Sequence, residues 1–265
     1  MSAGFRCKQF YVAHDACAMK VGTDALLLGA WAEVPAAIPL NTTQEKPQTS
    51  TILDIGCGTG ILSLMLAQRT TSAVMLDAVE LDSAAATQAK ANVRQSPWAD
   101  RIRVIERDIL TYPDSCDHPH RRRYQLIISN PPFFAAALVS KDEQRAKARH
   151  TDSLSFADLL ATAALLLAEE GVFSLILPCE AAQQLLQLAY ASGWYLQRRT
   201  LVSTLPGKAP IRTLFSLSRS NQPEAVPTQV QPDQVQKSDS LTIHQADGSY
   251  SEQYRWLLRD FYLKF

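Results

Sequence analysis

Short apolar runs alternate with helix-like segments through the middle of the chain. Five runs have the length and composition of buried strands: residues 52–55, 74–80, 101–105, 124–129 and 172–177. Segments with helical character lie between or after them. They are residues 61–69, residues 83–94, a segment that begins at 153 or 155 and ends at 168, and residues 180–191. Helix ends are predicted at Thr23 with Asp24, at Ser83, at Ser153 or Ser155, and at Gly171. Because parallel strands need crossover connections, this alternation predicts an α/β fold whose parallel sheet carries helices on both faces.

Two further β-rich segments, residues 194–203 and 211–217, are close enough in sequence to form a hairpin. Such a hairpin adds antiparallel strands to the parallel sheet. We therefore predict a doubly wound, mostly parallel sheet of seven strands, with an antiparallel C-terminal hairpin at its edge.

The segments outside this pattern suggest the domain organisation. Residues 1–32 have the character of a structured leader. Residues 33–50 contain three prolines and a polar run, and residues 219–240 are rich in Gln, Pro, Ser and Asp, so both are predicted to be loops. Residues 250–265 carry apolar side chains at helical spacing and should pack on the body. We predict one main domain over residues 51–265, preceded by the leader.

The composition excludes several classes of protein. Over 265 residues, 26 Lys and Arg balance 26 Asp and Glu, which excludes a uniformly basic nucleic-acid binder but leaves room for local basic patches. The longest uncharged apolar stretch, residues 159–168, is about half of the roughly 20 residues that a membrane-spanning helix needs. The first twenty residues lack the apolar core of an export signal, and the dispersed cysteines and histidines lack metal-ligand spacing. We expect a cytoplasmic protein with reduced thiols, no metal, no membrane contact and no obligate protein partner.

A glycine-rich turn links the first strand of this pattern to its first helix. Gly56, Gly58 and Gly60 alternate there, and glycine lets the backbone approach a ligand closely. The dinucleotide fingerprint would need another glycine where Ile61 stands, and a phosphate-binding loop would end in Gly-Lys-Ser/Thr. The turn therefore predicts a ligand that does not require a pyrophosphate-binding loop.

Acidic residues follow the next two strands. Glu80 ends the second strand about twenty residues after the turn, where an acid can accept hydrogen bonds from two ribose hydroxyls. Asp108 follows the third strand, where a carboxylate can accept a hydrogen bond from an adenine amine while Ile109 and Leu110 enclose the ring. These placements predict an adenosine-containing ligand.

The run Asp54-x-Gly56-x-Gly58-x-Gly60, with acids after the second and third strands, resembles the class I S-adenosylmethionine-dependent methyltransferases. The resemblance covers roughly residues 52–177. It implies a Rossmann-like fold with S-adenosylmethionine as the cofactor. It also implies that the glycine turn approaches the methionine moiety, that Glu80 holds the ribose and that Asp108 faces the adenine.

Asn130, Pro131, Pro132 and Phe133 follow the fourth strand, whose end lies beside the ligand crevice of a doubly wound sheet. An adenine amine is a poor nucleophile because its lone pair is delocalised into the ring. The Asn130 side-chain oxygen and the Pro131 carbonyl can accept both amine hydrogens and localise that lone pair, while the prolines fix the direction of the carbonyl. Phe133 can stack on the base and hold it in line with the methyl group. The four residues resemble the Asn/Asp-Pro-Pro-aromatic motif of methyltransferases acting on adenine amines or protein glutamine amides, and the motif does not separate these substrates.

The leader extends the resemblance to one family among these methyltransferases. Residues 8–10, 14–15, 17–24 and 28–31, with residues 95–99 and 250–254, look like the bacterial family that methylates the 6-amino group of adenosine 37 in tRNA1(Val). The likeness implies a tRNA anticodon stem-loop as substrate and a leader that closes over the cofactor. The candidate cofactor-binding residues are Thr23, Asp24, Asp54, Gly56, Cys57, Gly58, Gly60, Glu80, Leu81, Asp108 and Ile109. The alternatives are a protein glutamine-N5 methyltransferase acting on a release factor and a non-catalytic RNA-binding module.

Basic residues cluster locally despite the neutral net charge. One cluster follows the Asn-Pro-Pro-Phe element, and the segment 198–219 contains five basic residues and no acid. The candidate RNA-binding residues are Arg145, Lys147, Arg149, His150, Arg199 and Arg212. Such clusters can neutralise phosphates around an RNA loop. An adenosine in an anticodon loop is already single-stranded, so presenting it to the enzyme costs only partial unstacking.

Overall fold

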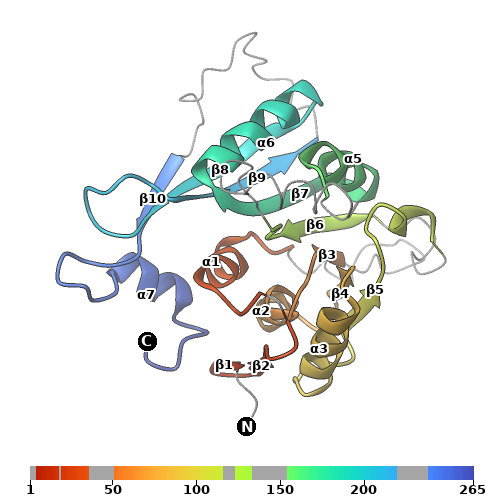
Figure 1. The fold of residues 1–265 in the computed structure, drawn as a ribbon, viewed down its shortest axis with the longest axis horizontal. Coiled ribbons are helices and arrows are strands. Elements are labelled where there is room, and N and C mark those ends of the chain that lie inside the picture. Colours follow the sequence, from red (N-terminus) through yellow and green to blue (C-terminus); the bar gives the residue numbers. More distant parts are fainter. Residues whose placement is uncertain (1–3, 18, 36–50, 116–122, 133–153, 220–237) are drawn as a thin grey trace, which may run out of the picture.

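One central sheet of eight strands runs through the computed structural model, which describes residues 4–17, 19–35, 51–115, 123–132, 154–219 and 238–265 (Figure 1). The strands are β3 (Thr51–Ile55), β4 (Met75–Glu80), β5 (Ile102–Glu106), β6 (Tyr124–Ser129), β7 (Leu167–Pro178), β8 (Tyr195–Ser203), β9 (Arg212–Ser218) and β10 (Ser238–Thr242). Their order is β10-β8-β9-β7-β6-β3-β4-β5. The five strands from β7 to β5 in this order are all parallel to one another. The predicted α/β fold with a mostly parallel sheet is therefore confirmed.

The antiparallel hairpin lies inside the sheet and not at its edge. β9 is antiparallel to both β7 and β8, and β10 then pairs in parallel with β8. The prediction of seven strands is wrong by one, and the predicted loop over residues 219–240 extends too far, because β10 begins at Ser238. Leu241 is the only strongly apolar residue of β10, so the segment carries little strand signal of its own. The β10 segment becomes a strand because it pairs with the free hydrogen-bonding edge of β8.

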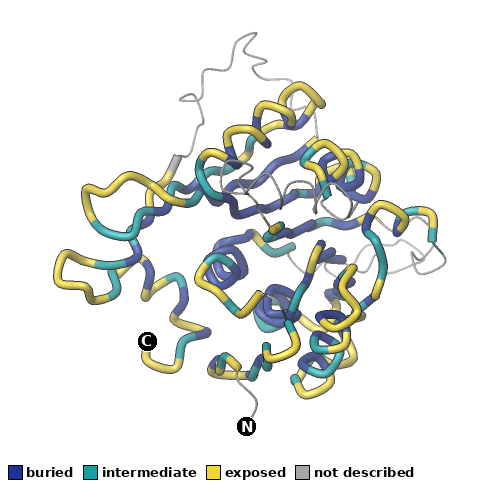
Figure 2. Tube along the Cα trace, viewed as in Figure 1, coloured by how far each residue is buried: buried dark blue, intermediate teal, exposed yellow. Residues whose placement is uncertain are grey.

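Helices cover both faces of the sheet (Figure 1). α1 (Thr23–Trp31), α2 (Ile61–Arg69), α3 (Ser83–Arg94) and α7 (Glu252–Leu258) pack on one side, and α5 (Phe156–Leu166) and α6 (Cys179–Ala191) pack on the other. A 3-10 helix, η1 (Tyr112–Asp114), follows β5, and β1 (Gly4–Arg6) and β2 (Tyr11–Ala13) form a separate hairpin. The core therefore has two apolar layers, and the central strands are buried on both faces (Figure 2).

Local capping confirms one of the predicted helix starts and corrects two others. Ser155 caps α5, and its hydroxyl accepts a hydrogen bond from the backbone N–H of residue 158. Neither Thr23 nor Asp24 caps α1, because the helix begins at Thr23 itself and leaves both side chains free of capping bonds. Asp82, and not Ser83, caps α3 through a 2.7 Å bond from the N–H of residue 85.

The leader shares the core of the main body. Residues 25–31 of α1 are buried in the same apolar layer as α2 and α7. Trp31 Nε1 donates a 2.9 Å hydrogen bond to Thr200 Oγ1 on β8. Lys8 Nζ, just after β1, donates to the backbone carbonyls of Arg259 and Phe265 near the C-terminus. The leader is therefore bonded both to β8 and to the C-terminal segment.

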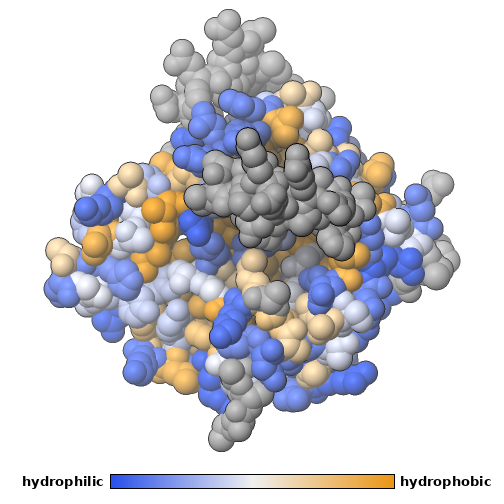
Figure 3. Space-filling model, in the orientation of Figure 1, coloured by the Kyte–Doolittle hydropathy of each residue, from blue (hydrophilic) through white to orange (hydrophobic). Residues whose placement is uncertain are grey.

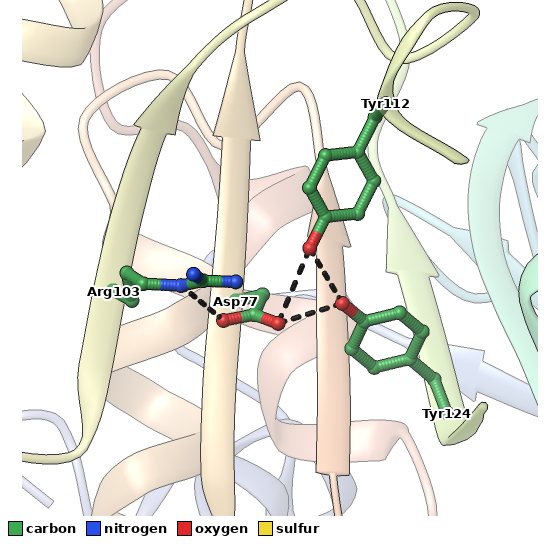
Figure 4. A network of polar contacts seen from close by, with 4 residues as sticks. All are labelled: Asp77, Arg103, Tyr112 and Tyr124. Atoms are coloured by element: carbon green, nitrogen blue, oxygen red, sulfur yellow. Dashed lines mark hydrogen bonds and ion pairs between the residues drawn. The ribbon is translucent and has the colours of Figure 1, made fainter. Parts of the chain in front are cut away.

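A buried polar network anchors the segment that follows β5 (Figure 4). Asp77 on β4 accepts hydrogen bonds from Arg103 Nε at 3.0 Å, Tyr124 OH at 2.6 Å and Tyr112 OH at 3.3 Å. The two phenol oxygens are 2.7 Å apart. Burial, followed by the charge of Asp77, raises the pKa of Tyr112 to about 12, so the phenol keeps its proton and can donate it. Because Tyr112 belongs to η1, the network fixes η1 and the preceding loop to the sheet.

Two features are absent from the described residues. None of the helices there is both long and apolar enough to cross a membrane. The same residues contain no group of three or more His, Cys, Asp or Glu side chains placed to hold a metal ion.

Gly171 has a packing role different from the predicted one. It lies within β7 and does not end the preceding helix. A Cβ at this position would lie 2.7 Å from the Tyr124 carbonyl oxygen and 2.8 Å from the side chain of Leu167. The absence of a side chain therefore permits β7 to approach β6 where their pairing register shifts.

We expect Gly171→Ala to lower the free energy of unfolding by about 1–3 kcal/mol, because the methyl group must displace backbone. The matched control is Glu170→Ala, which introduces the same residue at the neighbouring exposed position and should change stability by less than about 0.5 kcal/mol. Urea denaturation of both variants measures the difference. Equal stabilities would contradict the packing role.

Candidate functional site

A cavity of about 640 Å³ opens at the carboxyl ends of the central strands. Its walls come from segments far apart in sequence: residues 19–25, 56–59, 130–132, 211–212 and 243–244, with single residues from β7, α2 and α7. The cavity therefore brings together the leader, the glycine turn, the Asn-Pro-Pro element and the C-terminal segment.

Strand register places the glycine turn beside the Asn-Pro-Pro element. Ile55, the last residue of β3, pairs with Ser129, the last residue of β6. The next residues, Gly56 and Asn130, therefore leave adjacent parallel strands at the same level. α2, which follows β3, and α5, the next described helix after β6, pack on opposite faces of the sheet, and ligands of doubly wound folds bind where the helices change face in this way.

The glycine turn has a conformation that other residues rarely adopt. Gly56 and Gly58 have φ angles of 69° and 54°, and a Cβ built on either would have no atom within 4 Å. The backbone thus faces open space, and Gly58 lines the cavity. This bare backbone suits a ligand that must approach closely. Gly60, with a φ of 80°, instead lies close to Ala89 of α3.

The predicted acids lie along the edge of the sheet next to the turn. Glu80, at the end of β4, accepts hydrogen bonds from Gly58 N at 2.8 Å and from Asp82 N at 2.9 Å. Asp108 follows β5 and accepts a 2.9 Å bond from Leu110 N. Neither acid lines the cavity itself. Leu81 is exposed and Ile109 is buried beneath the loop. The acids therefore lie outside the cavity, on the β4–β5 side of the glycine turn.

Asp54 lies beneath the turn and not in the cavity wall. Its carboxylate is fully buried, and Oδ2 accepts hydrogen bonds from the Ser63 backbone N–H at 3.2 Å and from the Ser63 hydroxyl at 2.7 Å. Oδ1 accepts no hydrogen bond from any described residue. Burial raises the pKa of Asp54 to about 7, although the Ser63 bonds act in the opposite direction. Asp54 thus links the turn to α2 and leaves one buried acceptor unsatisfied.

Cys57 supplies the only thiol among the described residues of the cavity wall. Its side chain is buried, and this burial, together with the nearby carboxylates Asp54 and Glu80, raises the pKa of the thiol well above its usual range. The thiol therefore stays protonated near neutral pH and is a poor nucleophile.

Two predicted residues with different expected roles form an ion pair in the cavity wall. Asp24, predicted to contact the cofactor, accepts a 2.8 Å hydrogen bond from Nε of Arg212, predicted to contact RNA. Asp24 belongs to α1 and Arg212 begins β9, so the pair joins the leader to the hairpin. Thr23 lines the same wall.

The Asn-Pro-Pro element contributes three residues to the cavity wall. Asn130 and Pro131 are half-buried and Pro132 is exposed, and all three line the cavity. The Asn130 side chain makes no hydrogen bond within the described part of the chain. Phe133 lies outside the described residues, so its predicted stacking role stays a prediction.

Most of the predicted basic cluster also lies outside the described residues, namely Arg145, Lys147, Arg149 and His150. Arg199 is half-buried on β8, engages in contacts there and does not line the cavity. Hydrophilic and hydrophobic residues are intermixed over the face drawn in Figure 3. Of the predicted RNA-binding residues that the structure describes, only Arg212 reaches the cavity.

The structure adds residues that the sequence analysis did not select. Asn92 is buried, and its side chain bonds to the backbone of Ala13 at 3.0 and 2.9 Å and to the Thr59 carbonyl at 2.9 Å. It thereby ties the leader to the glycine turn. A sequence signal exists, because Asn92 falls on the buried alanine face of α3, where a polar residue needs a specific partner. His244 in the cavity wall had no comparable signal, and Tyr250 was selected only as part of the family resemblance.

Known proteins place the chain in a family. The family model described as the methyltransferase small domain matches residues 36–177. A protein of Yersinia enterocolitica named tRNA1(Val) (adenine(37)-N6)-methyltransferase is 42% identical over 99% of this chain and 93% of its own length. One of Yersinia pseudotuberculosis with the same name is 43% identical over the same shares. The chain belongs to the tRNA1(Val) (adenine(37)-N6)-methyltransferase family. The family resemblance predicted from the leader and the two motifs is confirmed.

Solved structures agree on the fold. A crystal structure of an Agrobacterium tumefaciens protein, described as a predicted O-methyltransferase, superimposes with a TM-score of 0.59 and 16% identity over 90% of this chain and 96% of that one. The family member described here thus has the class I methyltransferase fold, extended at one edge by β10.

The raised pKa of Asp54 predicts a pH-dependent stability. The folded state retains a proton between about pH 4 and 7 that the unfolded chain releases, so the free energy of unfolding should fall as the pH rises through this interval. The fall should reach a few kcal/mol, since one pKa unit corresponds to about 1.4 kcal/mol. Asp54→Asn keeps an oxygen for Ser63 and should remove this fall. Urea denaturation of the wild type and of Asp54→Asn at pH 5 and pH 8 measures the fall in the free energy of unfolding. An equal fall in the two proteins would refute the assignment of the pH dependence to Asp54.

Proposed function

We propose that this protein methylates the exocyclic N6 amine of adenosine 37 in tRNA1(Val), with S-adenosylmethionine as methyl donor. The observation that carries the proposal is the placement of Asn130 beside the glycine turn at the end of adjacent strands. Relatives of that name at 42–43% identity over 99% of the chain support the same substrate. Because tRNA is the substrate, we propose that the enzyme acts in the cytoplasm.

The residues present suit the methyl donor. Open space next to Gly56 and Gly58 leaves room for close approach to the backbone. Both carboxylate oxygens of Glu80 accept backbone N–H bonds and keep lone pairs that ribose hydroxyls can use, and Asp108 and Ile109 follow the adjacent strand, on the side that we assign to the adenine. When bound, S-adenosylmethionine supplies an electrophilic methyl group on a sulfonium centre. We assign the predicted cofactor-binding residues around the turn to this role.

Asn130 and Pro131 activate the target amine by accepting its hydrogens. Two acceptors on one NH2 group favour a tetrahedral nitrogen with a localised lone pair, which is the form that attacks the methyl carbon. With the methyl donor bound, the amine held by Asn130 and Pro131 would form the N–C bond as the methyl group leaves the sulfonium sulfur as a neutral thioether, and it would then release one proton to water. Charge complementarity and positioning supply the catalysis. No strong base is needed, in keeping with a protonated Cys57 and with Asp24 paired to Arg212.

The two alternatives lack such support. The motif alone accommodates a glutamine amide, but the relatives that match 99% of this chain are named as tRNA methyltransferases. A non-catalytic module would have no use for an Asn130 side chain held in the cavity without a protein partner among the described residues. The tRNA anticodon stem-loop is thus the proposed macromolecular partner.

Gly58→Ala should weaken S-adenosylmethionine binding by about tenfold or more, since the added methyl group occupies space the ligand needs and φ is left-handed. The matched control is Gly193→Ala, which has a φ of 76° and equally open surroundings but lies in the turn before β8. Both variants should lose similar stability, and calorimetric titration should show weaker binding only for Gly58→Ala. Equal affinities in the two variants would exclude Gly58 from the binding surface.

Asn130→Ala should lower kcat for tRNA methylation by about 10²–10³-fold while S-adenosylmethionine affinity stays within about threefold, because the lost acceptor acts on the amine. Asn130→Asp keeps an acceptor oxygen and should retain more activity than Asn130→Ala. Tritiated-methyl transfer to tRNA, followed by nucleoside mass spectrometry for N6-methyladenosine, gives the readout. Full activity of Asn130→Ala would overturn the proposed role, and transfer to a release factor instead of tRNA would overturn the substrate.

A further inference from the structure

A column of stacked aromatic rings ends in the cavity. The rings of His244 and Tyr250 are stacked with centroids 4.9 Å apart and an interplanar angle of 21°, and those of Tyr250 and Tyr254 are stacked at 4.9 Å and 15°. All three residues line the cavity. Tyr254 is buried, and Tyr250 stacks on both His244 and Tyr254. Among the described residues, no further ring stacks on His244, so His244 ends the column there, and its Nδ1 has no hydrogen-bond partner in the same part of the chain.

The backbone holds this column rigidly. His244 N donates a 2.9 Å hydrogen bond to the Thr204 carbonyl, and His244 and Tyr250 face each other as an antiparallel β-bridge. Tyr254 OH and Tyr262 OH lie 3.1 Å apart, which fixes the base of the column. The rings are thus ordered before any ligand binds, and an ordered ring costs less to use as a binding surface than a mobile one.

The column lies on the opposite side of Asn130 from the acids at the glycine turn. His244 follows β10 at one edge of the sheet, whereas Asp108 follows β5 at the other edge, and Asn130 follows β6 between them. Four strand spacings separate β6 from β10, roughly 19 Å at about 4.8 Å each. A base whose amine lies at Asn130 does not reach this far. A flat ring on His244 therefore belongs neither to the methyl donor nor to the methylated adenine.

Basic side chains accompany the column. Lys20 and Arg212 line the same cavity, and Lys208 lies in the turn between β8 and β9 that supplies Thr204 to the wall. Arg212 is paired with Asp24, which leaves Lys20 and Lys208 as the positive charges that can meet phosphate groups. Aromatic faces next to positive charge are the means by which proteins hold unstacked bases of single-stranded nucleic acid.

We propose that His244 is a stacking platform for a second nucleobase of the tRNA, one that neighbours the methylated adenosine in the anticodon loop. This proposal rests on the proposed function. The stacked base extends the His244–Tyr250–Tyr254 column by one ring and holds the loop open on the far side of Asn130. Because the contact is with a base that does not react, it contributes equally to binding of substrate and transition state.

The test compares His244→Ala and His244→Phe in steady-state methylation of tRNA. His244→Ala should raise KM for tRNA about tenfold, with kcat within about twofold and S-adenosylmethionine affinity unchanged, because a stacking face is lost. His244→Phe restores the face and should restore KM. The matched control is Tyr195→Ala, which removes an aromatic ring at the opposite end of β8, about 26 Å away at 3.3 Å per residue.

A second measurement removes the base instead of the side chain. Anticodon stem-loops with an abasic nucleotide on either side of the methylated adenosine are bound to the wild type and to His244→Ala, and affinities are measured by fluorescence anisotropy. One of the two abasic stem-loops should bind the wild type about tenfold more weakly than the intact stem-loop does. The affinity of this abasic stem-loop should not fall further when the protein carries His244→Ala. Thermal unfolding checks that each variant is folded.

Each other outcome contradicts the platform. An unchanged KM in His244→Ala, a fall in kcat alone, or additive losses in the abasic experiment would each show that His244 does not stack on a neighbouring base. Failure of His244→Phe to restore KM would indicate that imidazole hydrogen bonding, and not stacking, is involved. A wild-type protein that methylates no tRNA would instead overturn the proposed function.

Discussion

The hydrogen-bonded register between β3 and β6 is the constraint on which the site depends. Because Ile55 pairs with Ser129, the glycine turn and the Asn-Pro-Pro element leave neighbouring strands at one level. A slip of one residue would turn the side chains of β6 to the opposite face, and burial on both faces forbids it. Ser129 adds a 2.9 Å bond from its hydroxyl to the Ile55 carbonyl. The proposed donor and acceptor surfaces thus meet through main-chain geometry.

Polar contacts between segments far apart in sequence position the loops around the strand ends. Asn92 holds the leader at Ala13 and the turn at Thr59 with one amide, and the Asp24–Arg212 pair joins α1 to β9 across the cavity. The Asp77 network performs a similar task beside Asp108, where it fixes η1 to β4 and β6. These polar contacts set the positions of loops that apolar packing alone would leave adjustable.

Much of the fold follows from the sequence because the central strands are short, apolar and separated by helices. The bounds of β6 were predicted from its mostly apolar sequence, and Ser155 was one of two serines predicted to cap the following helix. The predictions that failed concern residues whose role depends on distant neighbours. By its sequence Gly171 looks like the end of a helix, but its contact with the Tyr124 carbonyl gives it a packing role within a strand. Similarly, the β10 segment looks like a loop by its sequence, but it forms a strand because it pairs with β8.

The sequence by itself determined the chemistry of this protein, since the glycine turn and the Asn-Pro-Pro element are short runs at strand ends and each acid lies at or just after the end of a strand. Local sequence is sufficient there because parallel strands place those ends at one edge of the sheet. Only the tertiary structure decided that Arg212 pairs with Asp24, that Asp54 lies beneath the turn, and that His244 ends an aromatic column in the cavity. Those relations join residues up to 188 positions apart, and their geometry depends on strand order and packing that periodicity does not encode.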